Sequence, residues 1–469
     1  MLQHSYAGAF YFTANMDITN EMLELLEHSI NGILHGSTEI EIVKINRLKL
    51  AEIFKERGLL DKALLLKYWC DYEIECIQCD GFIDYMFEPH SLDKERLKKF
   101  ELMKFDEGFL LRFPNMTHPD KIEEFKEPKV LKKMINEYNQ FIKSIGIDTV
   151  PKMNELIYNL NVNDIKLISE SYHEKKIAEI ASCLCNNYDK KRVISIAGPS
   201  SSNKTTFAKR LALALRCNGY NTLVIEMDDY FRNTDEIPCE DNGEQDWESI
   251  KCLNVELLGE RIKQLIQGKK VPRRRFNWSS GVSYDVPNEE MKLDEKCFLI
   301  IEGIHGLNPK LLNEIGRELV TPIYVQALSP LKIDNNHRFP SSDLRLIRRI
   351  TRDYLFRGGY PPRSTLERWT SVRIGEMNNI FPYQENAEYF FNSSLVYEVS
   401  VLSVYIKGLL AEATVAPKGQ DQNSEASIIS SDEAIRLQKL ISFFNPMPSE
   451  NIPRASCIRE FIGNSDLKY

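Results

Sequence analysis

The chain has 469 residues, of which 43% are hydrophobic and 27% are charged, so it is long enough to bury the cores of roughly two or three domains. Its formal net charge of -8 argues against a protein whose main task is to coat nucleic acid. Its cysteines are scattered without the dense spacing of a disulfide framework, and we find neither a secretory signal nor an apolar run long enough to cross a membrane. We therefore expect a cytoplasmic protein with reduced thiols.

The N-terminal part of the chain, residues 1–158, alternates between helical and strand spacing of its apolar residues. This pattern favours one α+β domain. A helical pattern then runs from Asn161 to Asn187 and predicts a connecting helix within residues 159–190.

A different alternation follows in residues 191–413, where short β-rich runs are separated by helical stretches. The strand candidates are residues 193–197, 223–227, 298–301 and 322–325. Such βαβ alternation predicts an α/β domain with a mainly parallel sheet flanked by helices. Residues 414–431 are rich in polar residues and predict a flexible linker, and residues 432–469 then form an apolar C-terminal tail.

The strongest signal lies between the first of these strands and the helix that follows it. A loop in this position lets backbone N–H groups surround phosphate oxygens at a helix N-terminus, while a lysine reaches the outer phosphates and a hydroxyl ligates Mg²⁺. We therefore predict a nucleotide-binding loop, with a serine-rich surface turn as the alternative. Its binding residues are Gly198, Ser200, Ser201, Ser202, Asn203, Lys204, Thr205 and Thr206.

One position of this loop departs from the pattern G-x-x-x-x-G-K-[ST], because Asn203 stands where the second glycine is expected. Glycine there permits a positive φ and a close phosphate, and asparagine is among the residues that best tolerate that conformation. Two interpretations stay open. The chain is either an enzyme with an altered loop or a non-catalytic sensor that binds ATP.

Two acids follow predicted strands, at the sheet edge where such folds bind ligands. Asp228 can accept the proton of an acceptor hydroxyl, since phosphoryl transfer needs a positioned base, Mg²⁺ and cations around the phosphoryl group. Glu302 ends a buried apolar run and is suited to holding Mg²⁺ near Thr205. For Asp228 the alternative is a turn or helix-cap aspartate, and for Glu302 it is a structural hydrogen bond.

Arginines recur at helical spacing between Asp343 and Gly359. A helix that carries them can close over bound ATP, because guanidinium groups neutralise charge on the phosphoryl oxygens. A solvated basic face is the alternative.

These motifs together resemble the uridine kinase and phosphoribulokinase family of P-loop kinases, and most closely a longer uridine kinase-like, or nucleoside kinase, subgroup. The resemblance extends to Arg368-Trp-Thr-Ser-Val-Arg373 and to the terminal Ile458-Arg-Glu-Phe-Ile-Gly. It implies transfer of the γ-phosphate of ATP, with Mg²⁺, to the 5′-hydroxyl of a nucleoside such as uridine or cytidine. The catalytic residues that it implies are Asp228 as base, Lys204 on the phosphates, and Arg349, Arg352 and Arg357 in a lid.

The resemblance also implies an acceptor site. Glu248 falls where the family binds the ribose hydroxyls, and Phe276 and Trp278 fall where family aromatics sandwich the base, with core aromatics as the alternative. Where uridine kinases place a histidine near the pyrimidine, this sequence has Ser279-Ser280-Gly281, so the base stays open. A kinase of another small alcohol or of a sugar phosphate is the second enzymatic interpretation.

The N-terminal part resembles the domain that precedes the kinase in this subgroup, which is itself similar to an additional domain of threonyl-tRNA synthetase. That synthetase domain uses H-x-x-x-H and C-x-x-x-H arrangements, which His28 and Cys79 do not complete here, so we expect no metal there. The expected partners are a small-molecule acceptor and, by family likeness, a second copy of the chain, without membrane or nucleic acid.

Overall fold

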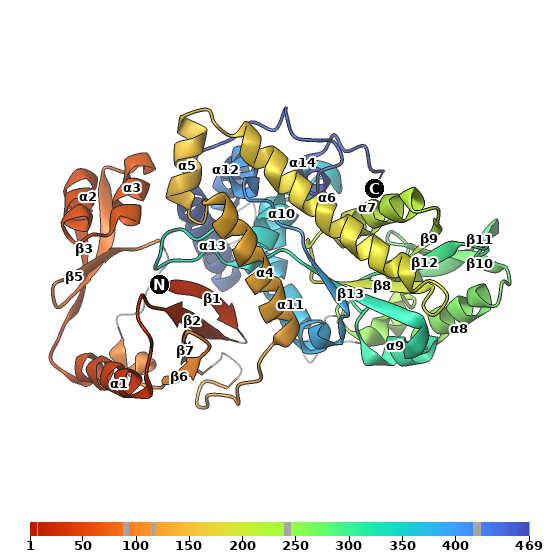
Figure 1. The fold of residues 1–469 in the computed structure, drawn as a ribbon, viewed down its shortest axis with the longest axis horizontal. Helices are drawn as coiled ribbons and strands as arrows, with labels where there is room; N and C mark the ends of the chain where they lie inside the picture. The colour runs from red at the N-terminus through yellow and green to blue at the C-terminus, as the bar shows by residue number, and fades with distance from the viewer. Residues whose placement is uncertain are drawn as a thin grey trace.

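The computed structural model describes residues 1–6, 8–87, 93–114, 118–238, 245–329, 331–415 and 424–468. Small antiparallel sheets from the N-terminal third lie at one end of the molecule, and a parallel sheet lies toward the other end (Figure 1). Long helices from both halves of the chain fill the space between them (Figure 1). No helix within the described ranges is long and apolar enough to span a bilayer.

The N-terminal region contains separate sheets where the sequence predicts one α+β domain. The first has the strand order β1-β2-β7-β6 and the second the order β3-β4-β5. The strands are β1 (Leu2–Tyr6), β2 (Ala9–Thr13), β3 (Ile40–Asn46), β4 (Glu73–Cys79), β5 (Phe82–Tyr85), β6 (Glu101–Phe105) and β7 (Gly108–Arg112). The helices are α1 (Asn20–His35), α2 (Arg47–Glu56) and α3 (Leu60–Tyr68).

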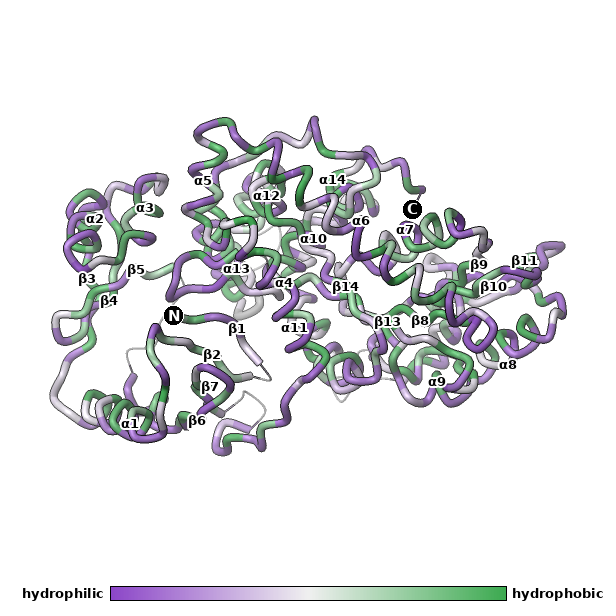
Figure 2. The backbone as a smooth tube through the Cα atoms, in the orientation of Figure 1, coloured by the Kyte–Doolittle hydropathy of each residue, from purple (hydrophilic) through white to green (hydrophobic). Residues whose placement is uncertain are grey.

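Local sequence explains several of these boundaries. Asn46 begins α2 because its Oδ1 accepts hydrogen bonds from the backbone N–H groups of Leu48 and Lys49, at 2.9 and 3.3 Å. The tight hairpin between β4 and β5 turns at Asp80 and Gly81, whose φ angles are 44° and 75°. Along α1, Figure 2 shows hydrophilic and hydrophobic residues alternating, and of these Leu23 and Leu34 are buried.

The parallel sheet has the strand order β14-β13-β8-β12-β9. Its strands are β8 (Val193–Ala197), β9 (Asn221–Glu226), β12 (Cys297–Glu302), β13 (Val320–Gln326) and β14 (Tyr389–Asn392). The first four confirm the predicted strands. From β8 the chain runs to β9 at one edge of the sheet and then returns to β12, which pairs with β8. It next crosses to β13 on the other side of β8, so the topological switch point lies at β8.

Helices cover both faces of this sheet, as predicted for βαβ alternation. Apolar residues of α6 (Asn163–Asn186) and α7 (Lys204–Cys217) pack on one face. Apolar residues of α8 (Val255–Ile266) and α9 (Pro309–Ile315) pack on the other. The helix expected between Asn161 and Asn187 is thus confirmed as α6. A hairpin of β10 (Val271–Asn277) and β11 (Val282–Met291) extends beyond the sheet (Figure 1).

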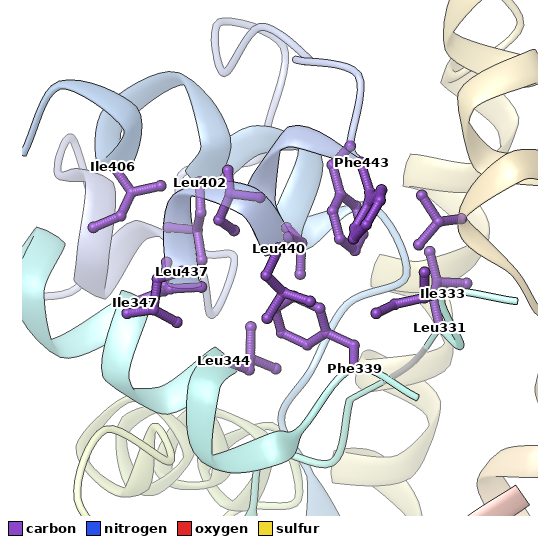
Figure 3. Packing of buried hydrophobic residues seen from close by; sticks show 14 of the residues in the cluster. Leu331, Ile333, Phe339, Leu344, Ile347, Leu402, Ile406, Leu437, Leu440 and Phe443 are labelled. Atoms are coloured by element: carbon purple, nitrogen blue, oxygen red, sulfur yellow. The ribbon is translucent and has the colours of Figure 1, made fainter. Parts of the chain in front are cut away.

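The largest apolar core lies between the sheets, among helices from distant parts of the chain. Figure 3 shows Leu344 and Ile347 of one helix facing Leu402 and Leu437 of two others. The same core includes Trp69 from the N-terminal region. Its helices are α4 (Lys129–Ile145), α5 (Val150–Tyr158), α10 (Ser341–Phe356), α11 (Pro362–Asn379), α12 (Glu398–Ala413), α13 (Glu425–Ser442) and α14 (Arg459–Ile462).

The polar stretch predicted as a linker over residues 414–431 is partly helical. Helix α13 begins at Glu425, while residues 416–423 lie outside the described ranges. Ser427 and Ser430 of this stretch are buried, and Arg363 of α11 donates hydrogen bonds to the carbonyl oxygen and Oγ of Ser427, each at 2.6 Å. Polar composition was misleading here because Ser427 is bonded to the buried guanidinium of Arg363.

Candidate active site

The loop between β8 and α7 forms a cup at the switch point of the sheet. Gly198 is required there, since a Cβ would lie 1.9 Å from the carbonyl oxygen of Val325. Asn203 adopts the left-handed conformation, with φ 68° and ψ 30°, so it takes the backbone shape expected of the glycine that it replaces. The buried hydroxyls of Ser201 and Ser202 have no hydrogen-bond partner in the described part of the chain, which fits a loop that awaits phosphate oxygens.

Lys204 and Thr205 follow the cup at the start of α7. Lys204 Nζ donates a hydrogen bond to the carbonyl oxygen of Pro199 at 3.1 Å. Burial lowers the pKa of Lys204, and the nearby carboxylates of Glu302 and Asp228 oppose this shift. The side chain is thus held at the loop among acids, without a close ion pair among the described residues.

The predicted metal pair is brought together. Thr205 Oγ1 donates a hydrogen bond to Oε1 of Glu302 at 2.7 Å. Burial raises the pKa of Glu302 to about 7, and Lys204 and the Thr205 hydroxyl oppose that shift. A hydroxyl and a buried carboxylate at this distance are oxygen ligands of the kind that Mg²⁺ prefers, so the donor set fits that ion.

Asp228 lies at the carboxyl end of β9, in a short 3₁₀ turn formed by Met227–Tyr230. Its side chain is exposed toward the site, and no hydrogen bond engages its carboxylate within the described ranges. Desolvation by the surrounding protein raises the pKa of the Asp228 carboxyl, while the positive charges of Lys204 and Arg357 oppose that shift. The structure therefore gives no support to the alternative of a capping aspartate, and leaves this carboxylate available to a ligand.

Glu248 faces the same region from the loop before α8. Burial and the neighbouring Glu376 raise its pKa to about 7, opposed by Arg349 and Lys204. A Cβ on Gly375 of α11 would lie 2.3 Å from the Cβ of Glu248, so this glycine lets the helix pack directly against the acid.

Helix α10 is not a solvated basic face, because many of its residues are packed into the protein core, and its role as a lid stays a prediction. Arg345 is 1% exposed and Arg348 is fully buried. Their guanidinium groups donate to the carbonyl oxygens of Ser200 and Ser201 in the loop, at 3.0 and 3.1 Å. The helix thus holds the loop through Arg345 and Arg348, which the sequence analysis did not select as site residues.

The three arginines that were predicted for the lid have different surroundings. Arg349 donates a hydrogen bond to Ser200 Oγ at 3.2 Å, so it does reach the loop. Arg352 is bonded to Asp353 of its own helix, with its Nε 2.9 Å from Oδ1. Arg357 is exposed at the end of α10, where it interacts electrostatically with Asp228. Two of the three therefore border the cup and the predicted base.

Residues 193–400 match the sequence profile of the phosphoribulokinase/uridine kinase family. The matched stretch begins at β8 and includes the loop, Asp228, Glu302 and α10. Residues 193–400 are therefore similar to members of that family. They form a P-loop kinase domain, with the strand order and loop position described above.

Uridine kinases are among the curated relatives. The one from Macrococcus caseolyticus (strain JCSC5402) is 28% identical over 192 residues, which are 41% of this chain and 82% of that protein. The one from Ligilactobacillus salivarius (strain UCC118) is 25% identical over 175 residues, 37% of this chain and 72% of that protein. A solved structure titled as a possible uridine kinase from Bacillus stearothermophilus covers 45% of this chain and 97% of its own, with 18% identity and a TM-score of 0.30.

The family match begins at residue 193, after the N-terminal region. Similarity of residues 1–158 to an additional domain of threonyl-tRNA synthetase therefore stays a prediction. The described residues include no group of three or more His, Cys, Asp or Glu side chains placed to hold a metal ion.

The kinase domain places its predicted acceptor aromatics at the β10–β11 hairpin. Phe276 is 8% exposed and Trp278 is 64% exposed. Their ring centroids are 5.0 Å apart with an interplanar angle of 76°. Rings that sandwich a base would be parallel and about 7 Å apart, twice the carbon contact distance, so a base cannot lie between these two as they stand. Phe276 is buried in a small apolar cluster with Phe231, Ile237 and Cys252, whereas Trp278 is largely exposed to solvent.

Glu376 is a residue of the kinase domain that sequence reasoning missed. Its Oε1 accepts a hydrogen bond from the backbone N–H of Ser200 at 3.2 Å, and Arg345 and Arg373 bond to its carboxylate. Although burial opposes the shift, these arginines hold the pKa of Glu376 below its usual range. No local motif marks this acid, since Arg345 lies 31 residues away in the chain.

A separate cavity of about 1710 Å³ lies between the kinase domain and the first N-terminal sheet. Residues of β1, β2 and α4, among them Tyr6 and Lys132, line it together with Lys332 and Arg345. Its walls come from these elements and not from the turn that carries Asp228. Arg345 and Arg373, which bond to Glu376 beside the loop, also line this cavity.

Proposed function

We propose that the chain is an ATP- and Mg²⁺-dependent kinase that transfers the γ-phosphate to the 5′-hydroxyl of a nucleoside. The observation that carries this proposal is the convergence of Lys204, Asp228 and the Thr205–Glu302 pair at the carboxyl edge of the sheet beside β8. Nucleotide-binding α/β folds place their ligands at this switch point.

The residues divide the work of phosphoryl transfer among them. The backbone amides of the loop and Lys204 bind phosphate oxygens, and Arg349 and Arg357 add positive charge at the edge of the cup. Mg²⁺ held through Thr205 and Glu302 would neutralise charge on the phosphates. The Asp228 carboxylate accepts a hydrogen bond from the acceptor hydroxyl and takes its proton as the phosphoryl group moves.

The acceptor side suits a molecule with hydroxyls and a flat ring. Glu248 can accept hydrogen bonds from a pair of ribose hydroxyls, and the exposed ring of Trp278 can stack on a base. The curated uridine kinases support a nucleoside, although their identity to this chain is low. Uridine and cytidine are therefore the first acceptors to test.

A panel of acceptors tests the proposal. The purified chain is incubated with ATP, Mg²⁺ and, in turn, each common nucleoside, several sugars and several sugar phosphates, and the phosphorylated products are separated by chromatography. We expect a nucleoside 5′-monophosphate from at least one nucleoside, and far slower formation of it by the Asp228→Asn variant. Transfer only to a sugar or sugar phosphate would show that the acceptor is not a nucleoside. Nucleotide binding without transfer to any compound would favour the interpretation of the chain as a non-catalytic ATP sensor.

A further inference from the structure

The side chain of Asn203 is tied to the end of the chain. Its Nδ2 lies 2.9 Å from the carbonyl oxygen of Cys457 and 2.9 Å from Oε2 of Glu460. An asparagine that precedes a helix usually accepts hydrogen bonds from the amides of that helix, but Oδ1 of Asn203 has no partner in the described part of the chain. The Asn203 side chain therefore bonds to the C-terminal segment, residues 445–468, and does not cap its own helix.

Glu460 lies where three elements meet. Besides Asn203, its carboxylate accepts a hydrogen bond from Thr206 Oγ1 at the start of α7. Its Oε1 is 3.8 Å from a guanidinium nitrogen of Arg352 in α10. One carboxylate thus connects the loop, the helix that follows it and the helix that supports it.

The C-terminal segment is firmly built into the protein. Cys457, Ile458 and Phe461 are fully buried. Arg459 donates to two carbonyl oxygens of the same segment, at 2.9 and 2.7 Å. The guanidinium carbon of Arg348 lies 4.9 Å from the ring centroid of Phe461. The chain end lies beside α7 in Figure 1, so the segment can hold the loop in a fixed position.

We propose that Glu460 is a positioning residue for nucleotide binding, which acts by holding the amide of Asn203. A left-handed backbone is less favourable for asparagine than for glycine, and the two bonds to Nδ2 offset that difference. With the turn fixed, the loop amides stay aimed at the phosphates. This inference rests on the proposed function, because it assumes that the cup binds nucleotide.

A double-mutant cycle on the full chain tests the coupling. The dissociation constant of Mg²⁺-ATP is measured by calorimetry for the wild type, Glu460→Ala, Asn203→Gly and the double variant. Because glycine needs no anchor, Glu460→Ala should weaken binding about tenfold or more when Asn203 is present, as for a lost charge-assisted hydrogen bond. In the Asn203→Gly background the same substitution should change binding by less than about threefold.

Two further variants separate positioning from general stability. Glu460→Gln keeps an acceptor oxygen for Nδ2 and should bind within about threefold of the wild type, even if Glu460→Ala does not fold. Glu450→Ala, which alters an exposed acid of the same segment, is the matched control and should bind as the wild type does.

Several results would overturn the inference. These are wild-type affinity in a folded Glu460→Ala variant, an equal loss in both backgrounds, or a large loss in Glu460→Gln. A wild-type chain that binds no nucleotide would instead contradict the proposed function, and the positioning role would fall with it.

Discussion

Two carboxylates of the site, those of Glu302 and Glu248, titrate unusually high for acids. Burial raises the pKa of each to about 7. In the proposed metal site, Mg²⁺ would have to displace a proton from Glu302 at any pH below that value, because a cation stabilises only the ionised form. The affinity of the site for metal is thereby linked to pH.

Calorimetry across pH measures this linkage. We expect Mg²⁺-ATP to bind the wild type about tenfold more weakly at pH 6 than at pH 8, since one unit below the pKa most of the carboxyl is protonated. ATP also titrates in this range, so Glu302→Gln is the reference. Its affinity should be weaker throughout and should lose the part of the pH dependence that is due to the protein. An equal pH dependence in both proteins would show that Glu302 holds no metal.

Asp228 is the proposed base of the chemical step. We expect Asp228→Asn to lower kcat by about 10²- to 10⁴-fold, the usual contribution of a general base, while Mg²⁺-ATP still binds. The neighbouring Asp229 is the matched control, because its carboxylate is paired with Arg275 at 2.6 Å and is not free. Asp229→Asn should retain most of the activity. Comparable losses in both variants would argue against Asp228 as the base.

At the level of elements, the loop could be predicted from sequence because all its determinants are local. A buried strand, a glycine, a lysine and a helix start lie within a few residues; β8 has the expected bounds, and α7 begins at the end of the loop. The surroundings of α10 could not be predicted in this way. Arg348 pairs with Glu398, which is 50 residues away, and only the folded chain brings the two together.

The buried ion pair between Arg348 of α10 and Glu398 of α12 leads to a prediction about stability. Arg348 donates through Nε and its terminal nitrogen to both oxygens of Glu398, at 2.6 and 2.7 Å, and neither side chain is exposed. Arg348→Ala should lower the free energy of unfolding by about 3–5 kcal/mol, because it leaves a buried carboxylate unpaired.

Chemical denaturation of the variants measures this change. Arg368→Ala, which removes an exposed arginine from α11, is the control and should change stability by no more than about 0.5 kcal/mol. Replacing both Arg348 and Glu398 by apolar residues should restore part of the loss. A single Arg348→Ala variant as stable as the wild type would show that the pair contributes nothing.

At the scale of the whole molecule, the N-terminal region shares a core with the kinase domain. Tyr85 donates a hydrogen bond to Asp334 of the kinase domain, and the ring centroids of Trp69 and of Phe443 in the C-terminal tail lie 4.5 Å apart in an edge-to-face arrangement. Composition and periodicity suggested a boundary near residue 158, but they carry no information on which apolar faces meet. The packing across that boundary therefore became visible only in the structure.

This shared core predicts that damage to the N-terminal region destabilises the kinase domain. Trp69→Ala should cost about 3–5 kcal/mol and lower the melting temperature of the whole chain, because it opens a cavity beside Phe443. Trp278→Ala, which removes an exposed tryptophan, should leave the melting temperature nearly unchanged. Calorimetry measures the melting temperature of both variants. Separate transitions, with the kinase transition unaltered in Trp69→Ala, would mean that the two regions unfold independently.

The most direct test of the account is the binding of Mg²⁺-ATP to the full chain, measured by calorimetry and compared with Lys204→Ala. We expect saturable binding at one site in the wild type and a large loss of affinity in the variant, because Lys204 supplies the positive charge at the cup. A wild-type chain that gives no heat of binding with ATP or GTP, or a Lys204→Ala variant that binds equally well, would contradict the assignment of this loop as the nucleotide site.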